Sequence, residues 1–199
     1  MAKFNYLEIH RSIARSKQGE KRVREVWQNR VNEQLPVLLQ EFDNHPVTQE
    51  IKAGPNSQNK SISGALKEGN LFSFLGFDYG DSPTAPVREV LQNEVRLATG
   101  VRKEPSANRT RFRFSLRIPT QRINEVSRLR WEQGRSWVSA VQNGISGFSY
   151  YLWKKFIGPR SHSFYGIQAK HSVRDGNDRS TPVRYLNQLF LDFVARLKK

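Results

Sequence analysis

The sequence predicts an α+β fold in which a small, mostly antiparallel sheet packs against helices, with a long amphipathic helix near the N-terminus. Apolar residues recur at three- and four-residue steps close to both ends of the chain, which is the spacing of a helix face. Between these ends, the stretch RTRFRFSLRIP alternates as a half-buried strand does. The strand-like stretches are not separated by regular helical segments, so parallel βαβ units are not expected. With 199 residues and no internal repeat, the chain is predicted to form a single domain, residues 1–199.

Residues 17–42 have the clearest helical pattern. Their apolar positions are Val23, Val26, Trp27, Val31, Leu35, Leu38, Leu39 and Phe42, with charged residues between them. Because Pro36 lacks a backbone donor and its ring clashes with the preceding turn, we expect it to kink or split this helix. Residues 1–16 are expected to form an N-terminal arm, or a short helix over Phe4–Ala14.

From residue 43 to residue 69 the composition changes to Asn, Gly, Ser, Pro and Lys. Within this segment, Val47–Ile51 predicts one short helical turn. The run AGPNSQNKS predicts an exposed loop over residues 54–63. A loop of this length is often functional or mobile, and the alternative is a plain solvated connection.

The stretch GNLFSFLGFDYGDSP, residues 69–83, places aromatic and leucine side chains between glycines. Its apolar residues are Leu71, Phe72, Phe74, Leu75 and Phe77. They are predicted to supply buried area, either in the subunit core or across a contact between subunits. The stretch leads into a helix that Ser82 or Thr84 would cap and that extends through Leu97, with Gly100 just past its end.

The clearest strand covers residues 111–118. Its apolar face carries Phe112, Phe114, Leu116 and Ile118, and its other face carries Arg111, Arg113 and Arg117. Pro119 ends this strand, and short helices are predicted over residues 120–129 and 135–145. A second strand is predicted over residues 164–174. A terminal helix follows through Leu197, with Thr181 as its cap and Pro182 in its first turn.

Composition narrows the classes of function. The chain has no cysteine, which excludes disulfides and thiolate metal sites and fits a cytosolic origin. No run approaches the 18 apolar residues of a membrane helix, and residues 1–18 lack the apolar centre of a secretory signal. Lys and Arg outnumber Asp and Glu by 33 to 18, and the net charge of +15 attracts polyanions and acidic protein surfaces.

Candidate catalytic and metal-binding groups are few. They are the pairs Asp78 and Asp81, Asp175 and Asp178, and His162 and His171. Paired carboxylates can act as acid and base or hold a cation, but closely spaced Asp residues beside glycine favour turns. For the two histidines, structural or solvent-exposed roles are favoured. The common phosphate-binding, dinucleotide-binding, zinc-protease and hydrolase motifs are absent, so we predict no enzyme activity, no cofactor and no metal site.

The three strand arginines are the best candidates for binding residues. Arg111, Arg113 and Arg117 project from one face at period two, and each guanidinium can offer paired donors to a phosphate or a carboxylate. Phosphate contacts of this kind bind a nucleic acid without recognising its base sequence. The alternatives are an interface with an acidic protein and a solvated sheet face whose charges prevent aggregation at the edge.

Several stretches taken together carry a resemblance to a known family. They are GNLFSFLGFDYGDSP with PVREVL after it, RFRFSLRIP, SWVSAVQNGISGFSYYLW and SHSFYGIQAK. In their order and composition they resemble the small neck and tail-completion proteins of tailed bacteriophages, above all those with contractile tails. The resemblance covers roughly residues 43–197.

This resemblance implies a structural virion protein that is made in the host cytoplasm and is not an enzyme. Such proteins have an α+β fold and assemble as homo-oligomeric rings around the DNA channel at the head-to-tail junction. Their partners would be other neck, portal-adaptor or tail proteins, with non-specific contact to genomic DNA and no membrane. The ring that this protein forms could be a head–tail connector, a tail-completion ring, or a tail or sheath terminator. The three arginines would then face an acidic neighbour or the DNA channel, and residues 54–63 and 158–163 would contact adjacent rings.

Two other hypotheses remain open at this point. In the first, the chain is a basic nucleic-acid-binding protein that acts directly on DNA or RNA through the same charge and the phenylalanines of the strand. Against it, Phe112 and Phe114 occupy the face opposite the arginines, so stacking and phosphate contacts would not share one surface. The second is a hydrolase that uses Asp78 or Asp81.

Overall fold

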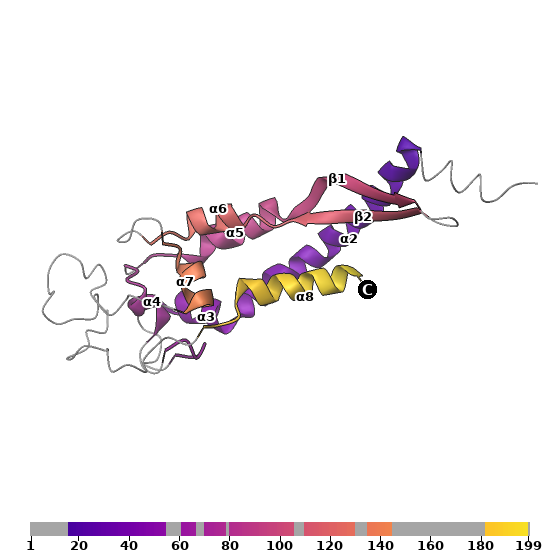
Figure 1. The fold of residues 1–199 in the computed structure, drawn as a ribbon. Coiled ribbons are helices and arrows are strands. Elements are labelled where there is room, and N and C mark those ends of the chain that lie inside the picture. The colour runs from indigo at the N-terminus through magenta and orange to yellow at the C-terminus, as the bar shows by residue number, and fades with distance from the viewer. Residues whose placement is uncertain are drawn as a thin grey trace, which may run out of the picture.

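The longest element, α2 (Lys17–Asn44), forms an axis against which several other elements pack (Figure 1). The computed structural model describes residues 16–54, 61–66, 70–78, 80–105, 110–129, 135–144 and 182–198. These residues form helices and one two-stranded antiparallel sheet. The predicted α+β class and the long N-terminal helix are therefore confirmed.

Helix α2 begins at a capped residue and continues without a break past its proline. The Oγ of Ser16 accepts a hydrogen bond from the backbone N–H of Gly19 at 2.9 Å. The helix is not split at Pro36. Pro36 has no N–H group to donate to the carbonyl of Asn32. Both residues are exposed, so water can donate a hydrogen bond to that carbonyl instead.

Two short helices follow α2. The first, α3 (Pro46–Lys52), confirms the helical turn predicted for Val47–Ile51. The second, α4 (Leu71–Phe74), begins at Asn70, whose side chain accepts a hydrogen bond from the N–H of Ser73 at 2.9 Å. Residues 1–15 of the predicted arm and residues 55–60 of the predicted loop lie outside the described residues.

The aromatic stretch around α4 forms part of the hydrophobic core. Leu71, Phe72, Leu75 and Phe77 are buried, and Phe74 is half-buried at the edge of the same cluster. Gly76 has a φ of 69°, a conformation that costs glycine little, and it lets the chain turn back sharply after α4. The ring of Phe77 then meets Trp137 edge to face, with centroids 6.3 Å apart.

Helix α5 (Thr84–Glu94) begins without a side-chain cap. Pro83 occupies the capping position, and no side chain bonds the first turn. Thr84 is buried within that turn, so the predicted capping by Ser82 or Thr84 is wrong. Pro83 has a fixed φ that already suits the start of a helix, and the N–H of Ala85 in the first turn donates to the backbone carbonyl of Ser82 at 3.2 Å.

The predicted helix also extends beyond the residue at which α5 ends. Val95 is extended, and β1 (Arg96–Pro105) begins directly after it, so the predicted helix through Leu97 with Gly100 past its end is wrong. Residues 96–105 pair instead with β2 (Thr110–Arg117), which confirms the predicted strand. The pairing of the two strands outweighs the local helical spacing.

The remaining elements largely confirm the predictions. Helices α6 (Thr120–Val126) and α7 (Trp137–Asn143) match the two predicted short helices. The terminal helix, α8 (Leu186–Lys198), begins later than predicted, so the expected place of Pro182 in its first turn is wrong. Residues 182–185 are not helical, and the N–H of Val183 donates to the carbonyl of Val141 at 3.1 Å instead of to a helix. Thr181 and the predicted second strand, residues 164–174, lie outside the described residues.

The bulkiest side chains of the core come from the helical end of the molecule, while the hairpin of β1 and β2 adds Leu97 to the core. The largest fully buried side chains are Trp137, Tyr185, Phe42, Phe72 and Phe193. They come from α2, α4, α7, α8 and the residue that precedes α8. The hairpin runs along the N-terminal half of α2, away from the end where α3, α4 and α7 gather (Figure 1). In the described part of the chain, none of the helices has the length and apolar character needed to span a membrane.

Candidate functional site: the arginine face of the hairpin

The pairing of β1 with β2 gathers arginines from both strands on one face. Residues that lie directly opposite each other in an antiparallel pair project from the same side of the sheet. Arg96 lies opposite Arg117, Arg102 opposite Arg113, and Glu104 opposite Arg111. We call the set Arg96, Arg102, Arg111, Arg113 and Arg117 the arginine face, and all five side chains are exposed.

An irregularity in β1 brings Arg96 onto this face. Between Leu97 and Val101, which pair with Leu116 and Phe114, three residues of β1 lie opposite the single residue Ser115. Two extra residues preserve the alternation of sides, because the side-chain period of a strand is two. Arg96 and Arg102 therefore project from the same side although they lie on either side of the irregularity.

The other side of the hairpin is fastened to α2. The rings of Phe114 and Trp27 lie 5.9 Å apart, and the Nζ of Lys103 lies 2.7 Å from a carboxylate oxygen of Glu20. Arg24 of α2 donates to the carbonyls of Ala98 and Thr99 at 2.8 and 2.7 Å. These contacts bind the apolar side to the helix and leave the arginine face turned outward.

The charges on the arginine face are poorly balanced. Its single acid, Glu104, lies 3.1 Å from a guanidinium nitrogen of Arg113. Arg96, Arg102, Arg111 and Arg117 form no ion pair with any described residue. Like charges directly opposite each other in a sheet are destabilising, and both Arg96–Arg117 and Arg102–Arg113 are such pairs. A bound anion would relieve this repulsion, so the arrangement suits phosphate or carboxylate groups.

The carboxylate pair considered for catalysis forms a turn. The N–H of Asp78 donates to a carboxylate oxygen of Asp81 at 3.0 Å, and the N–H of Asp81 donates to the carbonyl of Asp78 at 3.0 Å. Such bonds are typical of Asp in turns. The described residues hold no group of three acidic or histidine side chains that could bind a metal. The remaining candidates, His162, His171, Asp175 and Asp178, lie outside the described residues.

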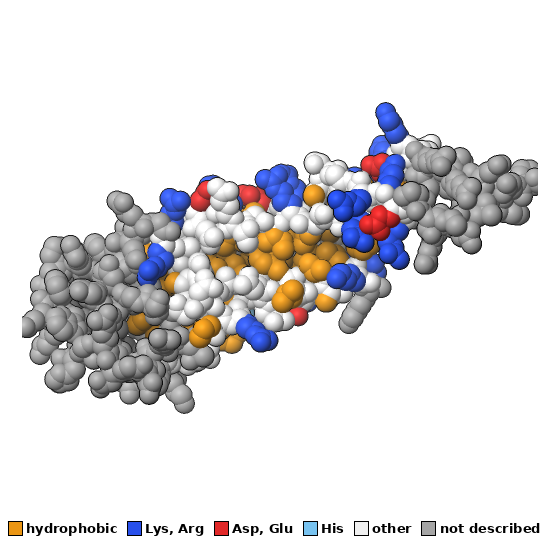
Figure 2. Space-filling model, viewed as in Figure 1, with side chains coloured by type: hydrophobic (Ala, Val, Ile, Leu, Met, Phe, Trp, Pro, Cys, Tyr) orange, Lys and Arg blue, Asp and Glu red, His pale blue; other side chains and the backbone are white. Residues whose placement is uncertain are grey.

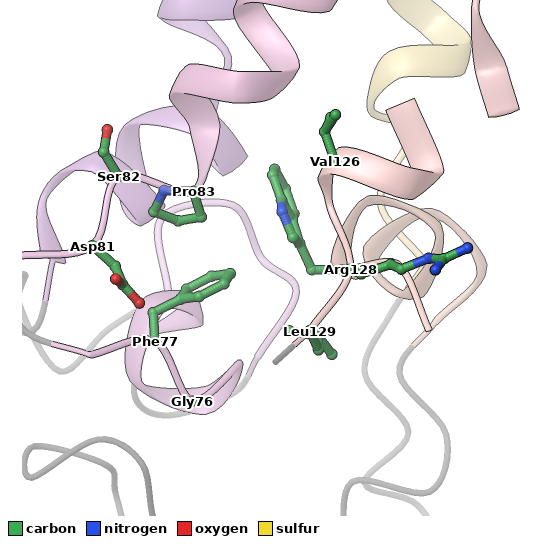
Figure 3. Close-up of a pocket in the computed structure, with 9 residues that line it drawn as sticks. Gly76, Phe77, Asp81, Ser82, Pro83, Val126, Arg128 and Leu129 are labelled. Atoms are coloured by element: carbon green, nitrogen blue, oxygen red, sulfur yellow. The ribbon is translucent and has the colours of Figure 1, made fainter. Parts of the chain in front are cut away.

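A small pocket lies near the opposite end of the molecule. Its volume is about 110 Å³, and its apolar lining includes Phe77, Pro83, Leu129 and Trp137. Arg128, which also lines it, directs its guanidinium away from Asp81 (Figure 3). Ligand pockets usually measure about 300 Å³ or more and have convergent polar groups. The arginine face is therefore the stronger candidate site.

The sequence pattern revealed three of the five arginines. The pattern does not indicate Arg96 and Arg102, because Ala98–Gly100 interrupt the alternation of β1 and the predicted helix extends through Leu97. Three of the four residues 101–104 are charged, so this part of β1 has no alternation of apolar and polar residues that would indicate a strand. Comparison of the chain with protein-family models, with curated proteins and with solved structures gives no match.

Proposed function

We propose that this protein is a structural subunit of the neck of a tailed bacteriophage, where copies form a ring around the DNA channel and join the head to the tail. The resemblance of its sequence stretches to neck and tail-completion proteins supports this function. The structural observation that carries it is the arginine face, which offers five exposed guanidinium groups and a single acid. In a ring, this face would be repeated in every subunit and would meet phosphates or carboxylates as a continuous cationic surface.

The arrangement of the hairpin favours contact with charged groups over the reading of bases. Proteins that bind single strands combine cationic grooves with aromatic rings on which bases stack. Here Phe114 packs against Trp27 on the side that faces α2, and Phe112 lies on that side too. The arginine face therefore has no aromatic ring of its own, and its partners would be phosphate groups or acidic side chains.

The alternative function, a nucleic-acid-binding protein that acts alone, depends on the same arginines. A titration of the isolated subunit with double-stranded DNA at increasing salt separates the two hypotheses. Tight binding whose logarithm falls linearly with the logarithm of salt concentration would favour the alternative. A neck subunit is expected to bind DNA weakly by itself and more strongly when assembled, because each added subunit contributes further phosphate contacts.

The decisive experiment locates the chain in intact virus particles. Mass spectrometry of purified particles should detect it, and labelling with a specific antibody should place it as a ring at the head-to-tail junction. A chain that is absent from the particle, and that stays monomeric at high concentration, would rule out the neck function.

Charge reversal tests whether the arginine face takes part in this function. We expect the triple substitution Arg111→Glu, Arg113→Glu and Arg117→Glu to block the joining of heads to tails. A matched control reverses three exposed charges elsewhere, through Arg128→Glu, Arg184→Glu and Lys198→Glu. Equal yields of complete particles from both variants would show that the arginine face is not a contact surface.

A further inference from the structure

The edge of β2 that faces away from β1 has no strand beside it in the described part of the chain. Among the residues that the structure describes, the sheet has two strands, and β2 pairs with β1 on one side only. Strand β1 contacts α2, and the carbonyls of Ala98 and Thr99 are bonded by Arg24. An unpaired strand edge presents a row of backbone donors and acceptors, which is a template for another strand.

Hydrophobic side chains of the hairpin, of α2 and of the residue after β2 are left incompletely covered. Trp27, Leu35, Phe114, Leu116 and Ile118 are only partly buried, and we call them the apolar strip. Figure 2 shows a band of hydrophobic side chains on the face between the hairpin and α8. Trp27, Val31 and Leu35 recur at four-residue steps and so lie along one side of α2. A strand added to β2 would cover part of this apolar surface.

The two sides of β2 specify the chemistry of the added strand. Side chains alternate between the two faces of a sheet, so every second residue of the added strand would cover the apolar strip. The intervening residues would lie beside Arg111, Arg113 and Arg117. Acidic residues at these positions would form the opposite-charge cross-strand pairs that stabilise a sheet.

A second copy of this chain does not meet these requirements when β2 pairs with β2. That arrangement would bring two arginine faces together, in a protein that already carries a net charge of +15. Like charges at an interface oppose association. The charges therefore favour a different protein with an acidic segment.

We infer that the edge of β2 receives an extended segment of an acidic partner protein, in which apolar residues alternate with Asp or Glu. The segment would be at most about as long as β2, which has eight residues. Backbone hydrogen bonds would supply affinity, and the alternating side chains would supply specificity, as in other cases of strand addition. The inference rests on the proposed function only in taking the arginine face as a contact surface, and it assigns that surface to carboxylates of a protein.

Synthetic peptides test this inference without altering the fold. The probe is an eight-residue peptide in which Val alternates with Glu, labelled with a fluorophore for anisotropy measurements. One control has the same composition with the four Glu residues grouped together. A second has N-methyl groups on alternate residues, which block the backbone hydrogen bonds of one strand edge. A third replaces Glu by Lys.

We expect the alternating acidic peptide to bind, and each control to bind at least about tenfold more weakly, because pairing, pattern and charge all contribute. Hydrogen exchange of the amides of residues 110–117 should slow when this peptide is added. Equal binding of the N-methylated or grouped peptide would reduce the interaction to charge alone and overturn the inference. Full protection of these amides in the free chain would do the same, since the edge would already be covered.

Two further measurements separate this inference from its alternatives. We expect the triple variant Arg111→Ala, Arg113→Ala and Arg117→Ala to bind the peptide at least about tenfold more weakly than the natural chain. The control variant Arg128→Ala, Arg184→Ala and Lys198→Ala should bind it with unchanged affinity. Double-stranded DNA that binds more tightly than the peptide would assign the face to phosphates instead. Failure of the peptide in a chain that still forms neck rings would overturn the inference alone, and absence of the chain from particles would overturn only the proposed function.

Discussion

The hydroxyl oxygen of Tyr185 lies 2.7 Å from Oγ1 of Thr48, and both groups are buried in the core. Thr48 belongs to α3, and Tyr185 directly precedes α8, so the hydrogen bond joins two segments that are 137 residues apart. Burial raises the pKa of Tyr185 above its ordinary value, by more than the hydrogen bond with Thr48 lowers it. The hydroxyl therefore stays protonated and available as a hydrogen-bond partner.

Tyr185→Phe is expected to destabilise the protein. The substitution removes one partner and leaves Oγ1 of Thr48 buried without a hydrogen bond, which typically costs about 1–3 kcal/mol. Urea unfolding at neutral pH measures this change. Thr48→Val should have a similar effect, and the double variant should lose less than the sum of the two single variants. Strictly additive losses would show that the two hydroxyl groups do not depend on each other.

His45 lies between α2 and α3, and both of its ring nitrogens are engaged. Nδ1 accepts from the N–H of Val47 at 3.2 Å, so Nε2 carries the proton and donates to the carbonyl of Arg184 at 3.2 Å. Burial lowers the pKa of His45 from its ordinary value of 6.5, by more than the hydrogen bond to Arg184 raises it. The folded protein therefore binds this proton less readily than the unfolded chain does.

This pKa shift predicts that mild acid destabilises the fold. Between the lowered pKa and 6.5 the unfolded chain holds more protons, so stability rises with pH across that interval. The contribution of His45 is fully present above pH 6.5 and is lost as pH falls through the folded-state pKa. Urea midpoints measured on either side of pH 6.5 should show this loss.

His45→Asn is the control, because asparagine also caps helices and can preserve the start of α3. The other three histidines remain in this variant and titrate as before. We expect a smaller loss of stability on acidification in the variant than in the natural chain. An identical loss in both would assign the pH dependence to other groups.

Glu50 is the buried acid of the core region, with only 1% of its surface exposed. One carboxylate oxygen accepts from the Oγ of Ser61 and the N–H of Ser63 at 3.0 and 2.9 Å, and the other accepts from the N–H of Leu71 at 2.8 Å. The N–H of Leu71 lies in the first turn of α4, where a helix has no internal acceptor for it. Glu50 thus holds residues 61–63 and the start of α4 together.

Glu50→Ala is therefore expected to be strongly destabilising. Three donors, two of them backbone N–H groups, lose their acceptor, and a loss of about 3 kcal/mol in the free energy of unfolding is the typical scale. Hydrogen exchange at Ser63 and Leu71 should accelerate in the variant. Glu33→Ala, at an exposed position of α2, is the matched control and should change stability little. Unchanged exchange at both amides would contradict this role.

The features that could be predicted from sequence are those set by local periodicity. The long apolar spacing of α2, the terminal pattern of α8 and the strict alternation of β2 each specify an element without reference to the rest of the chain. The pairing of β1 was not predictable in this way, because Ala98–Gly100 disrupt its alternation and its stability comes from β2. The sequence therefore does not indicate Arg96 and Arg102, which lie opposite Arg117 and Arg113.

Contacts between distant segments were also beyond local pattern. Nothing near Thr48 in the sequence indicates that its hydroxyl meets Tyr185, and nothing near Glu50 indicates that it caps the first turn of α4. Both contacts depend on where the helices pack. Buried polar groups of this kind are identified only once their partners are placed.

Phe77 and Phe74 offer the last prediction, because they distinguish core packing from a contact between subunits. Phe77 is 9% exposed and contacts the rings of Phe72 and Trp137, whereas Phe74 is half-buried. Phe77→Ala should lower the free energy of unfolding by about 3–4 kcal/mol, the usual cost of truncating a buried phenylalanine, and Phe74→Ala should cost clearly less. Thermal unfolding of the isolated subunit measures both. If Phe74→Ala unfolds normally but fails to assemble, its ring belongs to a subunit contact, whereas an unchanged midpoint for Phe77→Ala would contradict its place in the core.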